Sequence, residues 1–186
     1  MSNLIILIDM DNVIADQVDG FYRILADEYP EIILPPRESL SHFDIELNFP
    51  EEHRELIRSL RLRKDFFLTL APISGAKESL NRLSDAGHAI RIVTAPTWEW
   101  THCVAEKYAW VERHLGRSWC EKIILTRDKT MIKGDVLIDD APRIDGVFEP
   151  SWQHVVYDQP YNRTHPIPHR VTWESLGLFL ESFNIN

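Results

Sequence analysis

Two acidic residues follow directly on a short apolar run near the start of the chain. The run LIILI at residues 4–8 leads into Asp9 and Asp11, and a third acid, Asp16, follows a few residues later. In extended backbone the side chains of Asp9 and Asp11 point to the same side, because side chains alternate along a strand. Two carboxylates on one side repel each other unless a cation lies between them, so this spacing predicts a cation site.

Polar residues also follow three later apolar runs that are typical of buried strands. Thr94 closes the run AIRIVT, Lys129 follows KIILT, and Asp139 with Asp140 closes VLID. Ligands of parallel α/β sheets bind at the carboxyl ends of the strands. We therefore expect these groups at one edge, where hard oxygen ligands suit Mg²⁺ and the residues after Thr94 suit phosphate.

Each of these features alone has an ordinary structural explanation. An Asp after a strand is often a turn or capping residue, a strand-end Thr is usually structural, and an isolated Lys is usually solvated. Their occurrence at four strand ends predicts chemistry instead. Asp16 has no such support, and we interpret it as a polar or capping residue.

Apolar runs alternate with helical patterns, which predicts an α/β fold with a mostly parallel sheet flanked by helices. The stretch 17–71 breaks this rhythm and contains no convincing buried strand, so we interpret it as an inserted helical cap. The expected core domain is then residues 1–16 and 72–186. Strands are expected at 4–8, 89–94, 122–126, 136–139 and 154–158, and helices near 21–28, 51–66, 74–87 (capped by Ser74, stopped by Gly87) and 98–116.

Composition excludes several other classes of protein. The net charge of −9 argues against a nucleic-acid polymer as partner, although a small phosphorylated ligand remains compatible with it. The two cysteines provide no disulfide framework, and no apolar stretch has the length of a signal core or membrane span. We expect a cytoplasmic protein, and the sequence leaves open whether it forms a homodimer.

The order DxD, Thr, Lys, DD resembles the haloacid dehalogenase (HAD) superfamily of phosphatases. The segments DMDNVIAD, VTAP, EKYAWVERHLG, IILTRDKT and LIDDAP are similar, more closely, to the 5'(3')-deoxyribonucleotidase family. The resemblance covers residues 1–158 and implies a Rossmann-like core with a small helical cap. It also implies a Mg²⁺-dependent enzyme that dephosphorylates nucleoside monophosphates through an aspartyl-phosphate.

The resemblance further implies roles for individual residues. Asp9 would be the nucleophile, and Asp11 the general acid and then the base, which requires a pKa for Asp11 above the ordinary value of about 3.9. The other implied roles are phosphate binding by Thr94, Ala95 and Lys129, and Mg²⁺ binding by Asp9, the Asp11 carbonyl and Asp140, with Asp139 orienting the set.

Three positions depart from the family pattern. Asn12 replaces a common Gly, and because Asn tolerates left-handed backbone we expect the turn to be kept. Ala95 replaces a Ser of the animal relatives, and Gln17 replaces an aromatic residue, so the base pocket is expected to differ. The candidate substrate contacts are Phe67 as the first choice, Phe43, Arg37 and Trp98.

Other functions remain open from the sequence. A HAD phosphatase acting on another small phosphorylated metabolite would carry the same motifs. A phosphoacceptor signalling domain would place its acid pair after the first strand and its phosphorylated Asp after a middle strand. In this chain DxD comes first and DD last, and a cap-length insertion is present. A non-catalytic nucleotide-binding module would gain nothing from Asp9 facing a phosphate.

Overall fold

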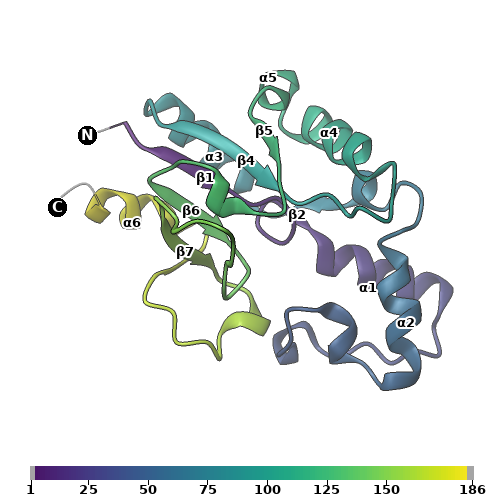
Figure 1. The fold of residues 1–186 in the computed structure, drawn as a ribbon. Helices are drawn as coiled ribbons and strands as arrows, with labels where there is room; N and C mark the ends of the chain where they lie inside the picture. Colours follow the sequence, from purple (N-terminus) through teal and green to yellow (C-terminus); the bar gives the residue numbers. More distant parts are fainter. Residues whose placement is uncertain (1–2, 184–186) are drawn as a thin grey trace.

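The computed structural model describes residues 3–183 and shows an α/β fold built on a six-stranded sheet (Figure 1). Neighbouring strands are parallel, in the spatial order β5-β4-β1-β6-β7-β8. This confirms the predicted fold class and all five predicted strands. The strands are β1 Ile5–Ile8, β4 Ala89–Thr94, β5 Ile123–Leu125, β6 Val136–Asp139, β7 Gln153–Tyr157 and β8 Arg170–Val171, of which β8 was too short to be predicted.

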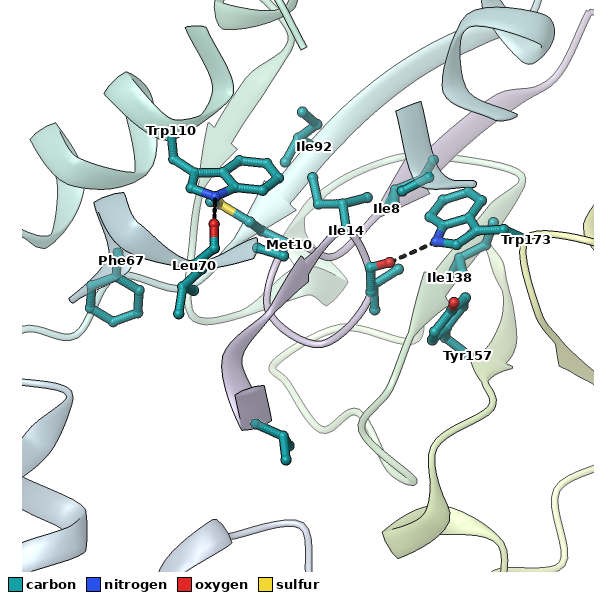
Figure 2. Close-up of a cluster of buried hydrophobic side chains, with 14 of the residues drawn as sticks. Ile8, Met10, Ile14, Phe67, Leu70, Ile92, Trp110, Ile138, Tyr157 and Trp173 are labelled. Atoms are coloured by element: carbon teal, nitrogen blue, oxygen red, sulfur yellow. Dashed lines mark hydrogen bonds between the residues drawn. The ribbon is translucent and has the colours of Figure 1, made fainter. Parts of the chain in front are cut away.

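The sheet is buried on both faces, which explains why its strands are continuous apolar runs. Ile6 and Ile8 of β1 belong to the large core cluster, whereas Leu7 between them belongs to a second cluster with Trp152. Figure 2 shows the first face, where Ile8 of β1 and its neighbour Ile138 of β6 lie beside the indole of Trp173. Alternate side chains of one strand therefore hold the sheet between two apolar layers.

Helices cover the face of the sheet that carries Ile6 and Ile8, and several of their predicted bounds were wrong. The helix predicted near 21–28 starts earlier, at Gln17, and the helix predicted over 51–66 ends at Leu60. The helix predicted to be capped by Ser74 begins at Ala76, with Gly75 as its N-cap at φ of +79°. The helix predicted from residue 98 begins at Cys103, because residues 97–102 form turns. The helices are α1 Gln17–Glu28, α2 Glu51–Leu60, α3 Ala76–Asp85, α4 Cys103–His114, α5 Arg117–Cys120 and α6 Leu176–Phe183.

Between residues 17 and 70 the chain makes helices and short 3₁₀ turns to one side of the sheet (Figure 1). The two ends of this excursion lie together, because β2 (Ala15–Asp16) pairs antiparallel with β3 (Ala71–Pro72). Its 3₁₀ turns are η1 Arg37–Ser39, η2 Ile45–Asn48 and η3 Phe67–Thr69. The predicted outer limits of the core, residues 1 and 186, lie outside the described residues.

None of the helices within residues 3–183 has both the length and the apolar character needed to cross a membrane.

Candidate active site

Adjacent parallel strands bring the predicted polar residues to one edge of the sheet. Asp9 directly follows β1, Thr94 ends β4 and Asp139 ends β6, and β1 lies between β4 and β6. The loop after β5 adds Lys129, the first residue of η4 (Lys129–Met131). A cavity of about 510 Å³ opens at this edge and is lined by, among others, Asp9, Asp11, Lys129, Asp139 and Asp140.

The turn after β1 depends on Asn12, as predicted. Asn12 has φ of +56°, and its side-chain Oδ1 accepts a hydrogen bond from the backbone N–H of Val18 at 3.1 Å. The amide of Gln159 donates to the Asn12 carbonyl at 2.7 Å. Asp16 is the N-cap of α1, accepting from the backbone N–H of Asp19 at 3.0 Å, so its predicted capping role is confirmed.

Lys129 lies between two buried carboxylates. Its ammonium is 2.5 Å from Oδ1 of Asp9 and also donates to Oδ2 of Asp139. Burial on its own would lower the pKa of Lys129, but the charges of Asp9 and Asp139 outweigh burial and raise it. Lys129 is therefore a fixed positive charge beside Asp9.

Asp9, Asp139 and Asp140 form a carboxylate cluster in which one oxygen from each lies within 4.8 Å of the others. Burial is the main cause that raises the pKa of Asp140 well above its ordinary value, and the negative charges of Asp139 and Asp9 raise it further. Hard oxygen donors packed this closely could hold a divalent cation, which would neutralise their repulsion.

The hydrogen bonds of the cluster distinguish its three acids. Both oxygens of Asp139 are occupied, Oδ1 by the N–H of Ala141 at 2.9 Å and Oδ2 by Lys129. No donor from residues 3–183 reaches Oδ2 of Asp9 or Oδ1 of Asp140. Asp9 and Asp140 thus keep an oxygen for a cation, whereas Asp139 fixes Lys129.

Lys107 of α4 was not predicted, although it contacts more of the predicted residues than any other cation. It is buried, and its ammonium donates to Oδ2 of Asp11 at 2.7 Å, to Oγ1 of Thr94 at 2.8 Å and to the carbonyl of Ala95 at 3.1 Å. It shares the buried helix face of Cys103 and Trp110 at spacings of four and three residues. The signal in the sequence was a lysine that has the helical spacing of the buried residues Cys103 and Trp110.

Asp11 has one occupied and one unoccupied carboxyl oxygen. Lys107 holds Oδ2, while Oδ1 is buried and has no hydrogen-bond partner among the described residues. Burial raises the pKa of Asp11, and the positive charge of Lys107 partly offsets this. The direction is the one that a general acid requires.

Comparison with known proteins agrees with this arrangement. Residues 3–177 match the model of the family described as "5' nucleotidase, deoxy (Pyrimidine), cytosolic type C protein". The chain belongs to this family. It is 40% identical over 172 residues to a Bordetella pertussis protein provisionally named 5'(3')-deoxyribonucleotidase, with 92% of each chain covered. It is 38% identical over 168 residues to the human cytosolic-type 5'(3')-deoxyribonucleotidase, covering 88% of this chain and 84% of that protein.

Solved structures support the fold of this nucleotidase-family chain. A HAD family hydrolase from Deinococcus radiodurans R1 superposes with a TM-score of 0.56 at 13% identity, covering 96% of this chain and 95% of that chain. The fold and the family relationship together make the chain a phosphatase of the HAD superfamily.

The structure brings only some of the predicted substrate contacts of this phosphatase to the cavity. Phe43 and Trp98 line it with 48% and 73% of their surface exposed. Phe67, the first choice, is fully buried, and the ammonium of Lys107 lies over its ring at 4.9 Å. Arg37 turns away to form two hydrogen bonds with Asp16 at 2.7 and 2.9 Å.

Other lining residues were not predicted as contacts, and one predicted phosphate ligand lies behind the cavity surface. Phe21, Arg61 and Arg127 line the cavity without having been singled out in the sequence. Thr94 is almost fully buried and does not line it, whereas its neighbour Ala95 does. Side-chain direction depends on tertiary packing, so the sequence alone could not sort these residues.

Proposed function

We propose that this phosphatase hydrolyses deoxyribonucleoside monophosphates through an aspartyl-phosphate on Asp9. The observation that carries the proposal is the position of Asp9, which lines the cavity beside a fixed ammonium and a carboxylate cluster. The substrate class comes from the relatives, because the human and bacterial proteins bear the name 5'(3')-deoxyribonucleotidase.

The first step forms a bond from Asp9 to phosphorus. The Asp9 carboxylate attacks, the bond from phosphorus to the nucleoside oxygen breaks, and Asp11 gives that oxygen its proton. In the second step Asp11 takes a proton from water as the water oxygen attacks phosphorus. Inorganic phosphate leaves, Asp9 returns as a carboxylate, and Asp11 is protonated again.

An anionic nucleophile attacking an anionic phosphate needs positive charge nearby. Lys129 supplies one charge and is held in place by Asp139. Mg²⁺, when bound, would be held by Asp9, Asp140 and the backbone carbonyl of Asp11, and it would supply further positive charge to stabilise the phosphoryl group.

Lys107 occupies one side-chain oxygen of Asp11 and the hydroxyl oxygen of Thr94. Because Lys107 occupies Oδ2 of Asp11, the proton that is transferred resides on Oδ1. An ammonium can only donate, so the hydroxyl of Thr94 accepts from Lys107 and helps to hold the lysine beside Asp11. The N–H of Ala95 is the adjacent backbone donor.

The excursion at residues 17–71 is proposed as a cap on the core formed by 1–16 and 72–186. It contributes Phe43 and Arg61 to the cavity wall, and the loop after β4 contributes Trp98. Aromatic rings in these positions would contact a nucleobase, while Ala95 and Gln17 make the pocket differ from that of the animal relatives. A cap over the cavity would limit the access of bulk water to the intermediate.

Phosphate release from a substrate panel tests the proposed function. Purified chain is given 5'- and 3'-deoxyribonucleoside and ribonucleoside monophosphates and sugar phosphates, with MgCl₂ or with EDTA. We expect release from the deoxyribonucleotides that EDTA and Asp9→Asn each abolish. Hydrolysis that survives either change would contradict the mechanism, whereas release from sugar phosphates alone would contradict only the substrate class.

A further inference from the structure

Asp140 is held by a short segment that the strand-end pattern does not include. The 3₁₀ turn η5 (Pro160–Asn162) follows β7 and lies against the end of β6. Its Asn162 donates from Nδ2 to the backbone carbonyl of Asp140 at 2.8 Å, and also to the carbonyl of Tyr157 at 2.9 Å. Its Tyr161 donates its hydroxyl proton to Oδ2 of the Asp140 carboxylate. One turn thus holds both the backbone and the side chain of Asp140.

The segment that carries Tyr161 is itself firmly held. Asn162 is fully buried, and the guanidinium of Arg170 donates to its backbone carbonyl at 2.9 Å. The Tyr161 side chain is only 2% exposed, and its ring lies edge-on to Phe43 at a centroid distance of 6.0 Å. The hydroxyl therefore has little freedom to leave Asp140.

This contact leaves the two oxygens of Asp140 in different surroundings. Oδ2 is occupied by the Tyr161 hydroxyl, while Oδ1 receives no hydrogen bond from the described residues. Oδ1 is thus available to a ligand in the cavity that Asp140 lines. Partners of this kind orient metal-binding carboxylates, and their loss weakens metal binding in known sites.

We propose that Tyr161 is a positioning residue for the cation site of Asp9 and Asp140, fixing Oδ2 of Asp140 so that Oδ1 faces the cation. The inference rests on the proposed function, because it requires the site to bind Mg²⁺. Without the hydroxyl, Oδ2 of a buried carboxylate would lack a donor, and the carboxylate would rotate to find another. Oδ1 would then leave the direction of the cation.

The test compares the Mg²⁺ affinity of the wild type with that of Tyr161→Phe, which keeps the ring and its packing. Affinity is measured without substrate, by titration calorimetry with MgCl₂ and by the rise in Tm with MgCl₂ concentration. We expect the Tyr161→Phe variant to bind Mg²⁺ about 10-fold or more weakly. In activity assays it should need more Mg²⁺ for half-maximal phosphate release and regain most of kcat at saturating Mg²⁺.

Tyr157→Phe is the matched control. Tyr157 is a buried tyrosine on β7 whose ring packs on Trp173 at 5.7 Å, and its hydroxyl has no hydrogen bond to residues 3–183. This variant should bind Mg²⁺ like the wild type. Equal Mg²⁺ affinity in Tyr161→Phe and the wild type would overturn the inference while leaving the proposed function intact. A wild type that binds no Mg²⁺ would overturn the proposed cation site itself.

Discussion

At the scale of single residues, the three acids of the stretch DMDNVIAD differ chiefly in their cationic partners. Asp9 pairs with Lys129, Asp11 with Lys107, and Asp16 with Arg37, each partner coming from a different segment. The sequence could separate Asp16 from the other two, because strand-end residues supported only Asp9 and Asp11. It could not assign the partners, because these pairs join residues far apart in the chain.

Replacing Lys107 by Met should test its link to Asp11. Burial would still raise the pKa of Asp11, but the opposing positive charge would be gone, so this pKa should rise further. The first step needs protonated Asp11, so kcat/KM falls as pH rises through that pKa. In Lys107→Met the alkaline fall should therefore move to higher pH. Below that fall kcat/KM should drop about 100-fold, because Asp11 loses the ammonium that holds its carboxyl in place.

Lys122→Met provides the control for this loss of a lysine. Lys122 lies away from the cavity, with its ammonium over the ring of Trp119 at 4.1 Å. Its pH profile should match that of the wild type. An alkaline fall in Lys107→Met at the wild-type pH or below would contradict the pairing of Lys107 with Asp11.

At the scale of elements, α4 combines core packing with the candidate site. Its Trp110 donates from the indole N–H to the Leu70 carbonyl at 2.8 Å, where the chain returns from the proposed cap (Figure 2). Helical periodicity predicted α4 and its end near Gly116. It could not predict that Glu106 and Lys107 are buried, because only their tertiary partners make burial of these charges favourable.

Glu106 should be essential for the stability of this junction. Its carboxylate accepts from the N–H groups of Asp65 at 2.9 Å and Phe67 at 3.2 Å, and from the indole of Trp100 at 3.1 Å. Glu106→Ala leaves these donors unpaired and should lower the free energy of unfolding by about 3 kcal/mol. Urea titration of the variant measures the loss.

Glu112→Ala on the same helix is the matched control. Glu112 pairs with Arg117 at 2.5 Å on the surface, and exposed ion pairs contribute about 1 kcal/mol or less. Equal losses in Glu106→Ala and Glu112→Ala would show that Glu106 does not hold the junction.

His154 of β7 should make stability depend on pH. Burial, together with the charge of Lys129, lowers the pKa of His154 to about 4. The folded state thus favours neutral His154, and its contribution is complete above the ordinary pKa of about 6.5 and lost as pH falls toward 4. Over that range the unfolding free energy of the wild type should fall more steeply than that of His154→Gln.

Chemical denaturation at a series of pH values measures this slope. His42→Gln removes an exposed histidine and should follow the wild type. Parallel slopes for the wild type and His154→Gln would contradict the inferred neutral state of His154.

At the scale of the whole molecule, the cavity lies where the sheet edge meets the excursion at residues 17–71. Ion pairs join the two parts, with Arg37 on Asp16 at 2.7 Å and Arg163 on Glu38 at 2.6 Å. Strand-end residues were predictable because a parallel sheet gathers its carboxyl ends by geometry. The cavity wall of the excursion was not predictable, because irregular backbone gives no rule for which side chains face inward. The sequence therefore could not show that Phe67 is buried.

The central claim is that Asp9 carries the phosphoryl group between the two steps. The most direct measurement mixes enzyme and deoxyribonucleotide with MgCl₂, quenches with acid within one turnover, and locates the added phosphate by peptide mass spectrometry. We predict a phosphorylated peptide modified at Asp9, and none in Asp9→Asn. Phosphate on another residue, or hydrolysis at full rate with unmodified Asp9 at every quench time, would contradict the claim.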